Sequence, residues 1–290
     1  MKIFLLSLLF LLSLSADDVQ DAIQACDNGN LETCNNLASL YAKQRDFSKA
    51  QTLYTKACSG NVFIACSNLG GMYESGDGVT KDITKALTLY DKACQGGDVN
   101  GCFNFGNTYA SGLGVAVDVQ KATPYLQKAC NGGYAQGCYV LGVTYYKAQN
   151  NTQAVTLLSK ACDAGSIEGC YVLGHLYFKA KGLEKNVILA LEQYEKSCHA
   201  GLAMGCFDAG VIYDNAKGVQ KDHFKAASLF QKGCDLGLAQ GCFNLANMYA
   251  NGQGKKQDIP QAMALFKKAC TGGMAQGCKN HDILQSTPIK

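Results

Sequence analysis

The stretch KACQGGDVNGCFNFGNTY, residues 92–109, determines how this chain folds. Cys94 and Cys102 stand eight positions apart, and Gly106 and Tyr109 follow the second cysteine four and seven positions later. Residues at i, i+4 and i+7 share one face of an α-helix. The stretch therefore predicts a helix that begins near Cys102 and packs through the face carrying Gly106 and Tyr109.

This stretch is one copy of a repeat that runs through the whole chain. The step from one cysteine pair to the next is 36 residues, with two steps of 32, and a fixed period in this range indicates stacked supersecondary units. The spacing within each pair is always eight: Cys26/Cys34, Cys58/Cys66, Cys94/Cys102, Cys130/Cys138, Cys162/Cys170, Cys198/Cys206, Cys234/Cys242 and Cys270/Cys278.

A second helix completes each repeat. Asp or Asn stands twelve positions before each later first cysteine, and these residue types cap helix N-termini by accepting backbone N–H bonds. The expected caps are Asp46, Asp82, Asp118, Asn150, Asn186, Asp222 and Asp258. We call the helix after the second cysteine of a pair helix A, and the capped helix that ends at the next cysteine helix B.

The predicted fold class is an all-α solenoid of seven A–B helix hairpins with capping helices at both ends. The two short repeats lose four residues between Tyr41 and Asp46, and between Tyr145 and Asn150. Both deletions fall in the A–B turn, which tolerates length changes better than packed helices do. We therefore expect residues 16–290 to form a single solenoid.

The N-terminal residues have the features of a secretory signal peptide. Lys2 precedes an apolar run from Ile3 to Leu14, and small residues follow at Ser15 and Ala16. A run of this length is too short to span a bilayer. We expect residues 1–15 to be removed, and the mature protein to be secreted or periplasmic.

The sixteen cysteines then predict a disulfide framework, because an even cysteine count in an exported chain is typical of one. The eight-spaced cysteines are the expected partners, since neighbouring antiparallel helices joined by a tight turn can bring them within range. A rival pairing would join the two ends of one hairpin, such as Cys66 with Cys94, but it leaves Cys26 and Cys278 without partners.

Composition excludes several classes of function. A net charge of +3 is too small to predict nucleic acid or an anionic membrane as the main partner. Dithiols without matching histidines make poor zinc sites, and the C-x-x-C redox motif is absent. We expect no metal and no cofactor.

The repeat resembles the Sel-like repeat family, relatives of the tetratricopeptide repeats. The family pattern is legible from Lys56 to Cys94 and again from Lys92 to Cys130, and with a cysteine pair in every repeat the chain is similar to the secreted Helicobacter cysteine-rich proteins. The resemblance implies a right-handed solenoid that binds proteins. It also implies an alternative activity, slow β-lactam hydrolysis or penicillin binding.

The residues themselves do not support that alternative. Serine β-lactamases need Ser-x-x-Lys, and no serine in this chain has a lysine three positions later. The four histidines form no H-E-x-x-H motif. No catalytic residue is predicted. The residues favour a chain that is not an enzyme, and a β-lactamase-type hydrolase stays open as the alternative that the resemblance implies.

A surface stripe on helix A is the predicted binding site. In tetratricopeptide relatives helix A lines the concave face, so the position two after the helix A cysteine, with the position four later, should face a groove. Asn there could hold an extended peptide backbone, or instead bond a neighbouring repeat. The predicted stripe comprises Asn36, Asn68, Met72, Asn104, Thr108, Val140, Val172, Leu176, Asp208, Asn244 and Met248. We expect a monomer that binds an envelope or host protein or peptide there.

Overall fold

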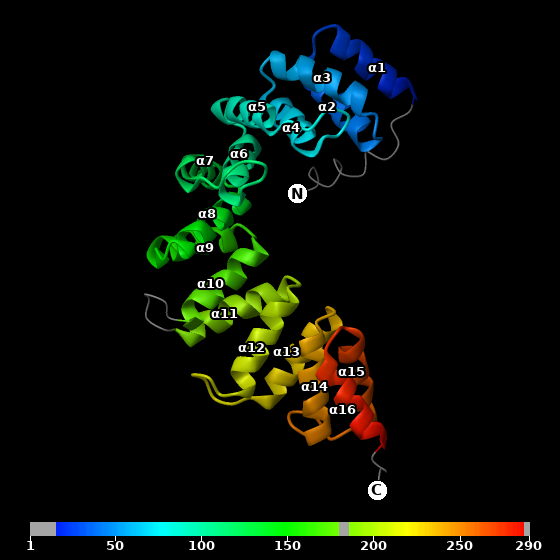
Figure 1. The fold of residues 1–290 in the computed structure, drawn as a ribbon, viewed down its shortest axis with the longest axis vertical. Coiled ribbons are helices and arrows are strands. Elements are labelled where there is room, and N and C mark those ends of the chain that lie inside the picture. Colours follow the sequence, from blue (N-terminus) through cyan, green and yellow to red (C-terminus); the bar gives the residue numbers. More distant parts are fainter. Residues whose placement is uncertain (1–15, 180–185, 287–290) are drawn as a thin grey trace, which may run out of the picture. The chain divides into compact units, whose positions relative to one another are not determined.

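The computed structural model describes residues 16–179 and 186–286, and in these ranges every regular element is an α-helix (Figure 1). The predicted all-α solenoid is confirmed. Residues 1–15, the expected signal peptide, lie outside the described residues. None of the described helices is long and apolar enough to span a membrane.

The helices alternate between the two predicted types. The B helices are α1 (Ala16–Asp27), α3 (Phe47–Ser59), α5 (Ile83–Gln95), α7 (Val119–Asn131), α9 (Asn151–Asp163), α11 (Val187–His199), α13 (His223–Asp235) and α15 (Ile259–Thr271). The A helices are α2 (Leu31–Lys43), α4 (Phe63–Ser75), α6 (Val99–Ser111), α8 (Ala135–Lys147), α10 (Ile167–Lys179), α12 (Ala203–Asp214), α14 (Ala239–Asn251) and α16 (Ala275–Ser286). The chain divides into two compact units, Met1–Gly137 and Cys138–Lys290, each of which is described by itself.

The row of caps is present in all seven hairpins. Each predicted Asp or Asn accepts the backbone N–H three residues into helix B. Its own backbone N–H donates to the carbonyl of the helix A tyrosine at 2.9–3.1 Å, from Asp46 to Tyr41 through Asp258 to Tyr249. The same bond closes the short and the long turns, so a four-residue deletion leaves the hairpin intact.

The core of each hairpin lies where helix B meets the small residue of helix A. A Cβ added to Gly70 would lie 2.6 Å from Tyr90 Cε1, and one added to Gly106 would lie 2.7 Å from Leu126 Cγ. Tyr90 and Leu126 are among the most deeply buried side chains. The small residue therefore lets helix B approach closely, as the sequence predicts.

The helix A tyrosine is less buried than its periodicity suggests. Tyr73 is buried, but the other six are half-buried. A lysine from the first turn of helix B lies over the ring in four hairpins, as where Lys85 Nζ lies 4.1 Å from the Tyr73 ring centroid and 2.6 Å from its hydroxyl oxygen. A lysine cation over the face of a tyrosine ring is a favourable contact, and here it joins helix A to the start of helix B.

Disulfides join each helix B to the following helix A. Seven links of the predicted eight-residue spacing have Cα–Cα distances of 4.5–4.8 Å: Cys26–Cys34, Cys58–Cys66, Cys94–Cys102, Cys162–Cys170, Cys198–Cys206, Cys234–Cys242 and Cys270–Cys278. Cys130 and Cys138 are also disulfide-bonded. The rival pairing of Cys66 with Cys94 is therefore wrong, because these cysteines belong to different neighbouring links.

Lysines also connect consecutive repeats. Lys56 Nζ donates to the Cys26 carbonyl at 2.9 Å, and Lys92 Nζ donates to the Cys58 carbonyl at 2.8 Å. Each bond satisfies a carbonyl at the end of the preceding helix B, where a positive charge is favourable. In α3 and α5 the lysine of the Lys-Ala-Cys motif thus ties the helix to the B helix before it.

Candidate binding surface on the A helices

The position two after each helix A cysteine is accessible in every repeat. Asn36 is exposed, and the others are half-buried: Asn68, Asn104, Val140, Val172, Asp208 and Asn244. These residues stand at the same level of consecutive A helices, so within each unit they form a row that a long ligand could follow.

The helix A cysteines that precede this row lie in the interior and form no part of the accessible surface. These residues are at most 3% exposed in seven of the A helices: Cys34, Cys66, Cys102, Cys138, Cys170, Cys206 and Cys242. A buried sulfur that is already bonded to its partner cannot contact a ligand. These cysteines are therefore the structural links between helices that the sequence predicts.

The other predicted positions of the stripe are buried, which corrects the prediction. Met72, Thr108, Leu176 and Met248 are only 6%, 2%, 0% and 3% exposed. Thr108 Oγ1 lies 3.4 Å from Glu74 Oε1 on the preceding A helix, so this position points between neighbouring repeats. These four side chains are part of the packing of one repeat on the next and cannot form an open groove.

The accessible face continues instead at the positions five and nine after the cysteine. In the second hairpin these are Gly71 and Ser75, and in the third they are Asn107 and Ser111. From α2 to α14 the fifth position is half-buried and the ninth is exposed. We call the positions two, five and nine after the helix A cysteine the A stripe.

Hydrogen bonding distinguishes the asparagines of the A stripe. Asn68 Nδ2 donates to Asn35 Oδ1 of the preceding A helix at 3.3 Å, so this amide already bonds a neighbouring repeat. The Asn104 and Asn244 side chains have no hydrogen-bond partner within residues 16–179 and 186–286. Their amides can therefore donate to and accept from a ligand.

The A stripe changes character along the chain. In α4 and α6 it carries small and uncharged polar residues, whereas α8 and α10 carry Val140, Val143 and Val172 with Lys147 and Lys179 at the ninth position. Val143 and Val172 are half-buried and pack on the cluster of Ala154, Leu158, Leu173 and Leu176. Unit 2 thus begins with an apolar floor edged by positive charge.

A polar cluster follows this floor. The Tyr171 hydroxyl donates to Asp208 Oδ2 at 2.9 Å, and His175 Nε2 lies 3.2 Å from the Tyr171 hydroxyl oxygen and 3.7 Å from Asp208 Oδ2. Burial raises the pKa of Asp208 and lowers the pKa of His175, although each attracts the other's charged form.

The tyrosine of this cluster is a poor nucleophile. Burial, together with the Asp208 carboxylate, raises the pKa of Tyr171 well above its usual range. The hydroxyl therefore stays protonated and serves as a hydrogen-bond donor. This arrangement suits holding α12 against α10 or recognising a ligand, and it offers no activated group for acyl transfer.

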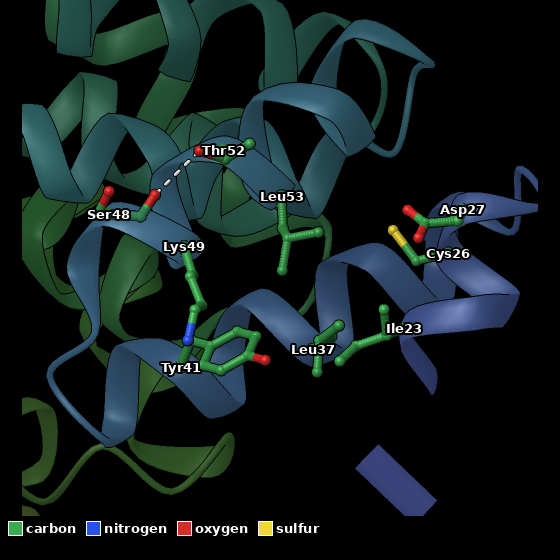
Figure 2. Close-up of a pocket in the computed structure, with 9 residues that line it drawn as sticks. All are labelled: Ile23, Cys26, Asp27, Leu37, Tyr41, Ser48, Lys49, Thr52 and Leu53. Carbon is green, nitrogen blue, oxygen red and sulfur yellow. Dashed lines mark hydrogen bonds between the residues drawn. The ribbon is translucent and has the colours of Figure 1, made fainter. Parts of the chain in front are cut away.

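A pocket of about 330 Å³ lies between the first helices of unit 1 (Figure 2). Ile23, Leu37 and Leu53 face one another across it, and the Lys49 amine lies beside the Tyr41 ring. Loop residues from Gly78 to Lys81 line the hollow at the next hairpin, but no residue of the short first turn lines this one. Sequence reasoning missed this pocket, whose lining residues come from three different helices.

A scan of protein families identifies the repeat. The Sel1 repeat model matches residues 64–98, 99–134, 135–166, 167–202, 203–238 and 239–274, which together make up most of the chain. The chain belongs to the Sel1 repeat family. A tetratricopeptide repeat model also matches residues 33–59, in the first hairpin. The comparison with curated proteins finds no match.

Two solved structures of Sel1-like repeat proteins share this fold, and a third is similar in sequence. A protective antigen of uropathogenic Escherichia coli with an SLR fold is 27% identical with a TM-score of 0.77, and the match covers 94% of this chain but 60% of that protein. A Sel1 repeat protein from Oxalobacter formigenes is 24% identical with a TM-score of 0.75, covering 92% of this chain and 80% of that one. Helicobacter pylori cysteine rich protein B is 28% identical with a TM-score of 0.25, covering 56% of this chain and 94% of that one.

Proposed function

We propose that this protein is an exported Sel1 repeat scaffold that binds an extended segment of a protein or peptide along the A stripe, as the concave face of the solenoid. The observation that carries the proposal is the accessibility of positions two, five and nine in successive A helices, while position six between them is buried in α4, α6, α10 and α14. A repeat protein with such a row offers one similar contact for each repeat.

In unit 1 the A stripe suits the backbone of a ligand. The Asn104 amide is half-buried and has no protein partner in the described ranges, so it can pair with a peptide N–H and C=O without demanding a particular side chain. Each such bond contributes about 0.5–1.5 kcal/mol. Affinity would come from several repeats together.

In unit 2 the A stripe suits an anchoring side chain. Val140, Val143 and Val172 supply apolar surface, and the ends of the same helices carry Lys147 and Lys179. An apolar ligand residue next to an acidic one matches this chemistry. Buried apolar anchors usually dominate the energy of such contacts.

Export is part of the proposal. The described cysteines are all disulfide-bonded, which is typical of oxidising compartments outside the cytosol. Expression of the full chain with its own N-terminus should yield an envelope or secreted protein whose mass begins at Ala16. An intact N-terminus on a cytosolic, reduced protein would refute export without affecting the proposed binding surface.

The binding proposal is tested with peptides selected from a random display library against the oxidised protein. Asn104→Ala should weaken binding of selected peptides by about tenfold at most, as expected for one lost hydrogen bond. The matched control is Gln120→Ala, because Gln120 is an exposed polar residue on helix B of the same hairpin. Equal affinity of both variants and the parent protein would contradict the proposal.

A further inference from the structure

The A–B loop edge of unit 2 exposes two large apolar side chains. Ile188 and Phe224 are 64% and 77% exposed, and both occupy the second position of a B helix, α11 and α13. The equivalent positions in the other described hairpins hold Ser48, Thr84, Gln120, Thr152 and Pro260. These two apolar residues therefore do not come from the repeat pattern.

Loops bring lysines near the starts of the two helices that carry these residues. Gly218, at φ +84°, lies against Val187 at the start of α11, and a Cβ there would lie 2.8 Å from Val187 Cγ2. Gly254, at φ +63°, lies against the His223 backbone at the start of α13. Lys217 thus lies by the helix that carries Ile188, and Lys255 and Lys256 lie by the helix that carries Phe224.

The charge of this edge is positive although the chain is nearly neutral. Lys217, Lys221, Lys255 and Lys256 have no ion-pair partner in the part of the chain that the structure describes. The nearby carboxylates are already engaged: Asp214 Oδ1 lies 2.8 Å from His223 Nδ1, and Asp222 and Asp258 cap α13 and α15. We call Ile188, Phe224 and the four lysines the docking edge.

We infer that the docking edge binds the surface of an anionic phospholipid bilayer. Exposed apolar side chains that insert at the boundary between headgroups and acyl chains, flanked by lysines that stay among the phosphates, are typical of peripheral membrane contacts. Each lysine near an anionic surface contributes about a fivefold increase in binding. This local charge acts over about a Debye length, so the small net charge of the whole chain does not oppose it.

A bilayer fits these observations better than a protein partner. Lysine is depleted from the cores of protein interfaces, whereas the loops at this edge carry four lysines. Two such edges from separate copies would bring lysine against lysine. A bilayer needs no complementary shape, and it accepts separate insertion points.

The test uses the oxidised mature protein and vesicles made of equal parts phosphatidylglycerol and phosphatidylcholine. The chain has no tryptophan, so Phe224→Trp provides a single probe at the docking edge. Its fluorescence should shift to the blue with these vesicles and not with pure phosphatidylcholine. An unshifted spectrum at low ionic strength would overturn the inference.

Cosedimentation with the same vesicles provides the second measurement. Phe224→Ser should weaken binding by about tenfold, and Lys255→Gln with Lys256→Gln by about fivefold for each lysine. The matched control is Ile64→Ser, because Ile64 is 46% exposed at the start of α4, away from the A–B loops. The inference would be contradicted if Ile64→Ser weakened vesicle binding as much as Phe224→Ser does. It would also be contradicted if the protein captured a soluble polyglutamate peptide but did not bind vesicles.

Discussion

Two adjacent glycines of α4 provide a sharp test of how the hairpins pack. A Cβ on Gly70 would lie 2.6 and 2.7 Å from ring carbons of Tyr90 and 3.3 Å from the Ala86 carbonyl oxygen. A Cβ on Gly71 would have only the Tyr90 hydroxyl oxygen within 4 Å, at 3.8 Å. Since Tyr90 is 1% exposed, its ring has little room to move away from Gly70.

We therefore predict opposite effects for Gly70→Leu and Gly71→Leu. Both gain helix propensity, up to about 1 kcal/mol, but only Gly70→Leu overpacks the core, at a cost of about 1–3 kcal/mol. The propensity gain cancels in the comparison, so the two free energies of unfolding should differ by about 1–3 kcal/mol. Leucine is the better probe than alanine, because Ala38 and Ala246 occupy the same position in other hairpins.

Urea unfolding of the two oxidised variants, followed by circular dichroism, measures this difference. Gly71→Leu should be at least as stable as the parent protein, and Gly70→Leu should be less stable than both. Equal midpoints for the two variants would mean that α5 does not approach α4 at Gly70, which would refute the hairpin packing described above.

Three further predictions follow from the other contacts. Replacing Cys94 and Cys102 together by serine should lower the free energy of unfolding by about 2.5 kcal/mol, as the loss of a nine-residue loop closure predicts, and an unchanged denaturation midpoint would count against a stapling role. The Lys85 ammonium donates to Tyr73 and holds the pKa of that hydroxyl below its ordinary value. Lys85→Met should therefore raise the Tyr73 pKa in an ultraviolet titration, where no change would refute the contact. Burial lowers the pKa of His175, so the stability that neutral His175 contributes is present above about pH 6.5 and is lost as pH falls through the lowered value. Between about pH 7 and about pH 5 the melting temperature of the parent should thus fall further than that of His175→Gln, and parallel curves would contradict the prediction.

The repeat architecture could be predicted from the sequence because it depends on residues that recur at fixed positions and act within one turn or one helix end. An Asp or Asn at a fixed distance before a cysteine satisfies backbone N–H groups whatever the neighbouring repeat does, so the caps from Asp46 to Asp258 were identifiable. Cysteines eight positions apart likewise meet across one tight turn, as Cys94 and Cys102 do. These features are local, and local chemistry determines them.

The accessible face of helix A could be predicted only in part. A helix turns roughly 100° per residue. The third and fourth residues after Asn104, which are Asn107 and Thr108, therefore point to opposite sides of the direction in which the Asn104 side chain points. Which of them faces solvent depends on where the neighbouring A helix packs, and the Thr108–Glu74 contact shows that the fourth is covered. The docking edge was missed for a similar reason, because only the fold brings Gly254, two residues before Lys256, against the start of the helix that carries Phe224.

The proposed role of the A stripe can be tested directly by photo-crosslinking. A benzophenone amino acid would replace Asn104 on helix A in one variant and Gln120 on helix B in another, and each variant would be irradiated with a peptide selected against the parent protein. We predict a crosslink from position 104 and none from position 120. A crosslink from position 120 with none from position 104 would contradict binding along the A stripe.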